Sequence, residues 1–230
     1  MLKRYKAVMI ITILLCLIPM AVGLILWDRL PDPIATHFGI DGEPNGWSSK
    51  AFTVFGMPLF LAGMELICAA AMSLDPKSRN IAAKPLLVVF ITMPVVSWFM
   101  AFTIYGYALG HRLNVGSLCC ILIGALFIAL GNYMPKNARN YSFGVRTPWA
   151  LDDDENWTHT NRVGSICFMV SGAVTLLTGL LTLKKTGAGT ACFIVIMAAA
   201  LISSAVTIVY SYLYFRKHGK GSGKDKNEAE

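Results

Sequence analysis

Six long apolar segments dominate the sequence and alternate with polar stretches. A helix needs about 20 apolar residues to cross a hydrocarbon core of about 30 Å, so each segment predicts a transmembrane helix. The predicted spans are 7–27, 51–74, 85–108, 116–133, 163–183 and 191–214. The pattern therefore predicts an all-α membrane protein with two long polar loops, a structured loop over 28–50 and a second loop over 134–162.

The first span could be mistaken for a signal peptide, because it follows the basic stretch "MLKRYK". Its 21 apolar residues exceed the usual 7–15 of a signal peptide. The candidate cleavage motif Ala21-Val22-Gly23 lies inside the apolar run and not after it. We therefore expect an uncleaved first span, with cleavage after Gly23 as the alternative.

Composition supports the membrane assignment. The chain is 55% hydrophobic and 14% charged, whereas a soluble domain carries about 25% charge. The net charge of +7 matters less than its distribution, so no nucleic acid is expected as a partner. The cysteines all fall within apolar runs and lack metal-binding spacing, which favours small buried apolar side chains and no cofactor. They are Cys16, Cys68, Cys119, Cys120, Cys167 and Cys192.

Basic residues predict the orientation. Fifteen of the 20 Lys and Arg residues lie in the N-terminal segment, the loops 75–84 and 134–162 and the C-terminal tail. Cytoplasmic segments carry such an excess, so both termini and loop 134–162 are expected inside, with loop 28–50 outside. The tail 216–230 has no apolar anchor and is expected to be disordered.

The outer loop, "DRLPDPIATHFGIDGEPNGWSSK", combines two prolines with dense turn chemistry. It predicts a short strand and a turn, followed by Trp47 at the membrane interface. His37 lies close in sequence to Asp41 and Glu43. A structural, hydrogen-bonded His37 is the favoured interpretation, and a divalent cation remains the alternative because no second His fixes a metal site.

The inner loop contains a predicted helix start. Asp152 and Glu155 have the spacing of a capping box, so the fifth helix should begin near Asp153, before the membrane. Arg146 and Arg162 could pair with the acidic cluster or bind lipid phosphate. A helical face is predicted to pack against neighbouring helices or the preceding loop. It consists of Trp157, Thr160, Asn161 and Gly164.

Glu65 is an acid within the second span, where insertion costs about 2.5–3.5 kcal/mol and demands a partner. Its candidate hydrogen-bond partners are Ser97, Thr92, Thr175 and Ser203. A proton or ligand role and a neutral packing role both stay open. Prolines are expected to kink spans one to three near this depth and open a cavity, and small residues should allow close packing of the last two spans. These are Pro19, Pro58 and Pro94, and then Ser171, Thr175, Gly179, Ala199 and Ser203.

The inner loop resembles the SdpI immunity-protein family. The resemblance rests on Gly131-Asn132, Lys136, Asn140, Gly144, "VRTPW" at 145–149, Trp157, "TNR" at 160–162 and Gly164. The outer pattern "LPDPIATHFGIDGEPNGWSSK" is similar to a small membrane domain of unknown function that often precedes the SdpI region. Together they cover roughly 10–75 and 110–185, which suggests an N-terminal two-helix domain over 1–84 and an SdpI-like four-helix domain over 85–215.

The resemblance implies a bacterial plasma-membrane immunity protein that confers resistance to a secreted toxin peptide. It also implies signal transduction, in which the toxin-occupied protein captures a soluble repressor. The motif positions are then candidates for partner binding. They are Asn132, Asn140, Gly144, Arg146, Thr147, Pro148, Trp149, Trp157, Asn161 and Arg162.

Two other functions compete with immunity. A small transporter or lipid-handling permease could use Glu65, although the sequence shows no inverted repeat. An enzyme is not expected, because His37 and Asp41 should lie outside while His159 lies inside. The expected partners are membrane lipids, a toxin peptide outside and a repressor inside, and a homo-oligomer is an open alternative.

Overall fold

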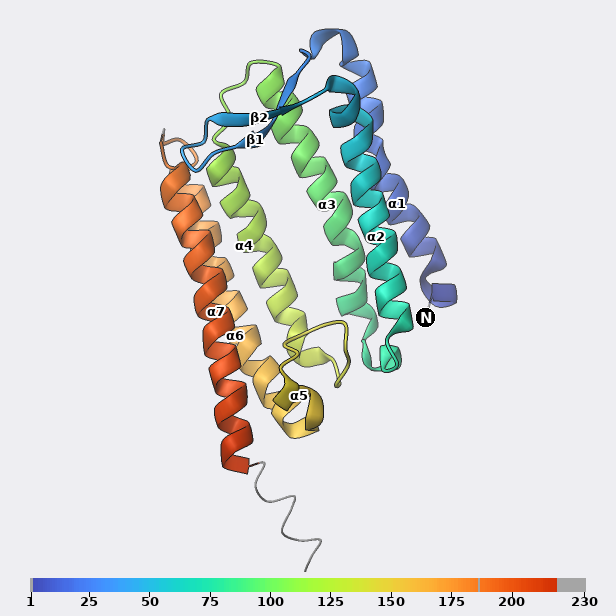
Figure 1. The fold of residues 1–230 in the computed structure, drawn as a ribbon, viewed down its shortest axis with the longest axis vertical. Coiled ribbons are helices and arrows are strands. Elements are labelled where there is room, and N and C mark those ends of the chain that lie inside the picture. Colours follow the sequence, from blue (N-terminus) through green and yellow to red (C-terminus); the bar gives the residue numbers. More distant parts are fainter. Residues whose placement is uncertain (1, 186, 219–230) are drawn as a thin grey trace, which may run out of the picture.

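The computed structural model describes residues 2–185 and 187–218, and its long helices confirm the predicted all-α membrane fold (Figure 1). Within this described part, six helical segments are long and apolar enough to cross a membrane. The long helices are α1 (Leu2–Ile25), α2 (Met57–Leu74), α3 (Ala83–Ala108), α4 (Val115–Tyr133), α6 (Asp154–Thr182) and α7 (Gly189–His218). α7 thus includes residues 216–218 of the expected tail, and residues 219–230 lie outside the described part.

Shorter elements connect these helices. A π-helix leads into α2, and 3₁₀ helices lie after α1, between α2 and α3, and after α4. These elements are Phe52–Gly56, Trp27–Arg29, Ser78–Asn80 and Met134–Lys136. The short helix α5 (Pro148–Asp152) lies beside the start of α6, at the end of the molecule opposite the β-hairpin (Figure 1).

Helices α1, α2 and α3 pack together as one group. Side chains of α3 donate hydrogen bonds to the backbone of α1. Pro19 has no N–H, so the carbonyl of Leu15 lacks its usual partner four residues ahead. Trp98 Nε1 donates to this carbonyl at 3.1 Å. Ser97 Oγ donates to the carbonyl of Cys16 at 2.8 Å. Such bonds satisfy the backbone groups that a proline releases inside a membrane.

Pro19 and Pro94 lie inside α1 and α3, whereas Pro58 occupies the first turn of α2. The cavity lined by Pro19, Pro58 and Ser97 has a volume of only about 10 Å³. That space holds one water molecule at most. Side chains therefore fill nearly all of the space between these prolines, and the larger cavity expected from the kinks is not present here.

Helices α4, α6 and α7 form a second group with a close backbone contact between α4 and α6. A Cβ atom added to Gly124 would lie 2.7 Å from the carbonyl oxygen of Gly172, and one added to Gly172 would lie 2.8 Å from that of Gly124. Only glycine fits on both sides of such a crossing.

Small residues also bring α6 and α7 together, as the sequence predicted. Ser171 Oγ and Ser203 Oγ share a hydrogen bond of 2.7 Å. Gly179, which was expected in the same contact, instead faces α4, where an added Cβ would lie 2.7 Å from the carbonyl oxygen of Ser117. The sequence pattern identified the small residues of α6 but not that two neighbouring helices use them.

Loop 28–50 forms an antiparallel hairpin of β1 (Ile34–Phe38) and β2 (Pro44–Ser48). The hairpin lies across one end of the helices (Figure 1). Phe38 packs edge-on against Tyr107 of α3 with ring centroids 4.9 Å apart. Thr190 Oγ1 of α7 donates to the carbonyl of Ile40 at 3.2 Å. The hairpin therefore bridges the two helical groups.

Candidate functional site

The polar segment 134–162 is folded around buried amide side chains. Asn140 is fully buried, and its Oδ1 accepts the backbone N–H groups of Ser142 at 3.0 Å and Phe143 at 2.7 Å. Its Nδ2 donates to the carbonyl of Ala138 at 2.9 Å. One side chain thereby replaces the backbone partners that a regular helix or strand would supply.

Asn161 of α6 fixes the next part of the segment. Its Oδ1 accepts the N–H of Val145 at 2.8 Å, and its Nδ2 donates to the carbonyl of Trp157 at 3.0 Å. Gly144 has a φ of +110°, which side chains rarely tolerate, and a Cβ there would collide with Asn161 Oδ1. Gly144 and Asn161 therefore act as a structural pair.

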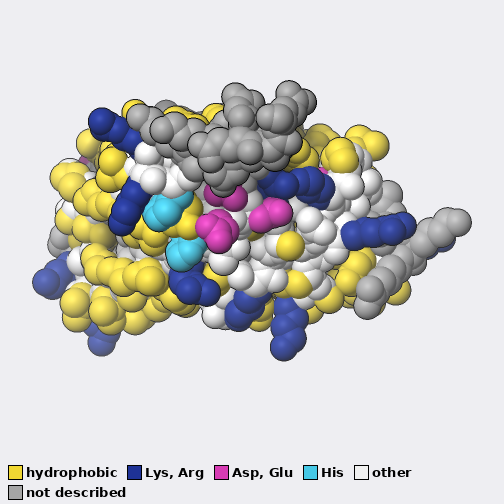
Figure 2. Space-filling model, turned by 90° about the horizontal axis from the view of Figure 1, so that it is seen from below, with side chains coloured by type: hydrophobic (Ala, Val, Ile, Leu, Met, Phe, Trp, Pro, Cys, Tyr) yellow, Lys and Arg dark blue, Asp and Glu magenta, His cyan; other side chains and the backbone are white. Residues whose placement is uncertain are grey.

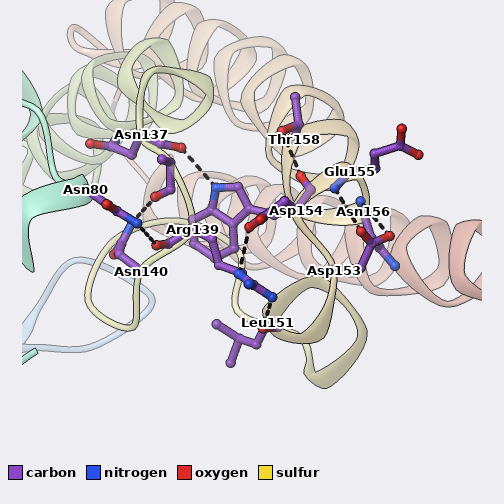
Figure 3. A network of polar contacts seen from close by, with 12 residues as sticks. Asn80, Asn137, Arg139, Asn140, Leu151, Asp153, Asp154, Glu155, Asn156 and Thr158 are labelled. Carbon is purple, nitrogen blue, oxygen red and sulfur yellow. Dashed lines mark hydrogen bonds and ion pairs between the residues drawn. The ribbon is translucent and has the colours of Figure 1, made fainter. Parts of the chain in front are cut away.

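Trp157 connects α6 to the loop between α2 and α3 through Asn137, which lies after α4. Its ring is buried, and Nε1 donates to the carbonyl of Asn137 at 2.9 Å. The Oδ1 of Asn137 accepts the N–H of Ala82 at 2.9 Å, while Asn80 Nδ2 donates to the carbonyl of Arg139 (Figure 3). The predicted packing face of α6 is confirmed, since Thr160 and Asn161 are also fully buried.

Asp75, directly after α2, is a central residue that the sequence did not single out. Its Oδ2 accepts the N–H of Tyr141 at 2.9 Å and the hydroxyl of Ser142 at 2.7 Å. Its Oδ1 accepts the N–H of Lys77 at 2.8 Å. The only sequence signal is an acid followed by Pro76 at the end of an apolar run, which predicts a turn but not a contact with a distant loop.

The N-cap of α6 lies one residue after the predicted position. Asp153 is the N-cap, and its carboxylate accepts the N–H groups of Glu155 at 3.0 Å and Asn156 at 3.2 Å (Figure 3). Asp152 instead ends α5. The helix does begin near Asp153, as predicted, but the expected capping box of Asp152 and Glu155 is wrong.

The predicted partners of the acidic cluster are also corrected. Arg139 Nε lies 2.8 Å from Asp154 Oδ1, and Arg139 Nη1 donates to the carbonyl of Leu151 at 2.9 Å. Among the side chains of residues 5–185 and 187–218, this is the only ion pair, so neither Arg146 nor Arg162 pairs with an acid there. Arg139 reaches Asp154 because the intervening chain folds back through α5.

The Asp153→Ala variant is expected to lower the free energy of unfolding by about 1 kcal/mol, the usual effect of losing an N-cap side chain. Thermal unfolding of the purified protein in detergent measures the change. Asp152→Ala is the matched control, because this exposed neighbour does not cap α6. A larger loss for Asp152→Ala than for Asp153→Ala would contradict the cap assignment.

The "RTPW" part of the segment, residues 146–149, packs against α7. Thr147 Oγ1 and Ser211 Oγ share a hydrogen bond of 2.5 Å, and Thr147 Oγ1 also accepts the N–H of Ala150 as the cap of α5. The rings of Trp149 and Tyr212 lie 5.1 Å apart. Thr147 is therefore a buried structural residue, whereas Trp149 is half-buried.

The motif residues divide into a buried set and an exposed set. Asn140, Thr147, Trp157 and Asn161 are buried and hold the segment together. The residues that a partner could touch are Asn132, Arg146, Pro148 and Arg162, all exposed, with the half-exposed Trp149. Figure 2 shows this end of the molecule, with Lys and Arg side chains towards its edge and acidic side chains nearer the middle.

Glu65 finds its partners on α1, which overturns the predicted set on other helices. The buried carboxyl contacts the hydroxyl of Thr12, and Cys16 Sγ lies 3.4 Å from Oε2. Thr12 and Cys16 are four residues apart and so lie on one face of α1. The predicted partners bond elsewhere: Ser97 to Cys16, Thr92 to Val88, Thr175 to Ser171, and Ser203 to Ser171 and Cys167.

The candidate residues of loop 28–50 lie on the hairpin, far from segment 134–162 (Figure 1). His37 Nδ1 shares a hydrogen bond with Asn45 Oδ1 across the two strands, and Asp41 Oδ1 accepts the N–H of Glu43 in the turn. Trp47 is exposed on β2. Among the described side chains, no group of three His, Cys, Asp or Glu residues is placed to hold a metal ion.

Comparison with known proteins agrees with the two residue patterns noted in the sequence, one in loop 28–50 and one in segment 134–162. Residues 136–211 match the SdpI/YfhL protein family, and residues 14–62 match a domain of unknown function, DUF1648. The immunity protein SdpI of Bacillus subtilis (strain 168) is 23% identical over 208 residues, which cover 90% of this chain and 96% of that protein. No solved structure matches the chain significantly. The chain is thus similar to SdpI proteins, and its region that matches the domain of unknown function precedes its region that matches the SdpI/YfhL family.

Proposed function

We propose that this protein is a plasma-membrane immunity factor that protects a bacterium from a secreted antimicrobial toxin peptide. The observation that carries the proposal is the similarity to a protein named as an immunity protein over 96% of that protein's length. The two family models match this chain over both the hairpin region and the polar segment, so its similarity to known proteins extends beyond a set of apolar spans.

The proposed orientation places the hairpin outside and segment 134–162 in the cytoplasm, with both termini inside. Two observations support it. The hairpin and segment 134–162 lie at opposite ends of the helices (Figure 1). Within residues 2–185 and 187–218, most Lys and Arg residues belong to the start of α1, the loop between α2 and α3, segment 134–162 or the end of α7, all at the end with segment 134–162. The hairpin is then the part that meets the toxin or competes for its target.

The second part of the proposal is signalling by capture of a soluble repressor. The exposed motif residues Arg146, Pro148 and Arg162, with the half-buried Trp149, form its candidate contact surface. They are held on a rigid scaffold, because buried Asn and Thr side chains fix the backbone on either side of them. A surface that is preformed in this way loses little conformational entropy on binding.

We propose that the protein acts by binding and not by catalysis. His37 lies on the hairpin, whereas His159 stacks on Tyr214 beside the start of α6, at the other end of the molecule. The acids near His159 serve as the cap and the ion-pair partner at the start of α6. Catalytic groups must lie within hydrogen-bonding reach of one another, and these two sets do not.

Expression in a strain that is sensitive to an Sdp-type toxin peptide tests the immunity proposal. Cells that produce the protein are expected to survive a toxin dose that kills cells carrying the empty vector. Protein abundance in the membrane fraction is measured in parallel. Unchanged killing of cells that contain the intact membrane protein would contradict immunity.

A further inference from the structure

We propose that the cavity between the end of α2, α3 and the turn 141–146 binds an anionic phospholipid. The cavity has a volume of about 410 Å³. It combines an apolar wall from α2 and α3 with a polar rim from segment 134–162. This combination matches a lipid, whose acyl chain and charged headgroup need two adjoining environments.

The apolar wall lies at the last turns of a membrane-spanning helix. Met72 and Val89 line it from α2 and α3, and Leu74, the last residue of α2, is 81% exposed at its edge. An exposed leucine at the end of a span is placed to contact an acyl chain. Because the wall belongs to two spans, the occupant reaches it from the lipid phase.

The polar rim carries a guanidinium group that forms no ion pair with the described side chains. Arg146 is exposed, and its Nη1 donates to the carbonyl of Tyr141 at 2.5 Å. Arginine has five N–H donors in a fixed plane, so this one bond orients the group and leaves donors for a phosphate. No carboxylate in the described part of the chain pairs with Arg146.

A second cation lies beside the same turn. Lys77 Nζ is 5.7 Å from the centroid of the Tyr141 ring. Asp75 also lines the cavity, but its carboxylate is 6% exposed and accepts three hydrogen bonds, from Tyr141, Ser142 and Lys77. Lys77 and Arg146 carry two positive charges and Asp75 carries one negative charge, so the local net charge is positive. This charge favours the binding of one phosphodiester and disfavours a headgroup that carries its own cation.

Native mass spectrometry of the full chain, purified in detergent and stripped of lipid, tests the proposal. Phosphatidylglycerol is expected to bind at least about tenfold more tightly than phosphatidylcholine, because both lipids carry a phosphodiester but phosphatidylcholine adds a cation, which the positive charges of Arg146 and Lys77 repel. Arg146→Gln should remove most of this preference. Ala71→Trp, which fills the cavity wall, should weaken binding of phosphatidylglycerol without changing the guanidinium group.

Arg162→Gln is the matched control, because Arg162 is exposed in the same polar segment but does not line the cavity. This variant should bind phosphatidylglycerol as the wild type does, and all variants should unfold at the wild-type temperature. Equal binding of the two lipids, or unchanged binding by a folded Arg146→Gln protein, would overturn the proposal. Displacement of the lipid by inorganic phosphate alone would also overturn it, since it would show a site for free anions.

Discussion

The Gly124→Leu variant is expected to lose stable folding, the largest effect of any single substitution considered for this chain. A Cβ at position 124 would lie 2.5 Å from the backbone nitrogen of Leu176 and 2.7 Å from the carbonyl oxygen of Gly172. Backbone atoms of a packed helix cannot move aside as a side chain can. Helices α4 and α6 would have to separate, and the free energy of unfolding should fall by about 3 kcal/mol or more.

Size-exclusion chromatography and thermal unfolding in detergent measure this effect. Gly63→Leu is the matched control, because a Cβ at this glycine of α2 would meet no atom within 4 Å. We expect the control to elute and unfold as the wild type does. Equal behaviour of Gly124→Leu and Gly63→Leu would show that α4 and α6 do not approach at Gly124.

The Asn161→Ala variant is expected to loosen segment 134–162 while the six spans remain inserted. The substitution removes the acceptor of the Val145 N–H at 2.8 Å and the donor to the Trp157 carbonyl at 3.0 Å. A buried backbone group left without a partner costs about 1–3 kcal/mol. Brief trypsin treatment should then cut the segment faster than in the wild type, at its Lys and Arg residues.

Arg162→Ala serves as the control for this prediction. It removes a neighbouring exposed side chain that has no part in the buried network, so the cleavage rate of the remaining sites should stay at the wild-type value. If Asn161→Ala resists trypsin as the wild type does, the segment owes its fold to other contacts.

The spans could be predicted from the sequence because the bilayer imposes a length. Every apolar run long enough to cross it became a long helix, from α1 at Leu2–Ile25 to α7 at Gly189–His218. The start of α6 was also predictable, because acidic side chains stabilise the first turn of a helix. These signals are local, and each depends on residues that are close together in the sequence.

Contacts between distant segments could not be predicted. Glu65 faces Thr12 and Cys16 because α1 packs against α2, and hydropathy does not say which helices are neighbours. The carboxylate of Asp75 meets Tyr141 because the turns at the ends of α2 and α4 lie side by side. The glycine contact between α4 and α6 was missed for the same reason.

The motif of segment 134–162 was interpreted as a set of partner-binding residues, but several members serve the fold. Asn140 and Asn161 are fully buried and complete the hydrogen bonding of irregular backbone. A sequence shows that an asparagine is present, but not whether its amide faces water or the protein interior. For partner binding, the motif therefore leaves mainly Arg146, Pro148, Trp149 and Arg162.

The opposite placement of the hairpin and segment 134–162 across the membrane is the central claim, because toxin contact and repressor capture require different sides. Glu43→Cys introduces an exposed thiol at the hairpin turn, and Thr158→Cys introduces one near the start of α6. The unsubstituted protein corrects for its own cysteines, which lie within the spans.

A membrane-impermeant maleimide applied to intact cells measures the orientation directly. Glu43→Cys is expected to react in intact cells, and Thr158→Cys only after the membrane is permeabilised. Reaction of Thr158→Cys in intact cells, with Glu43→Cys protected, would contradict the account.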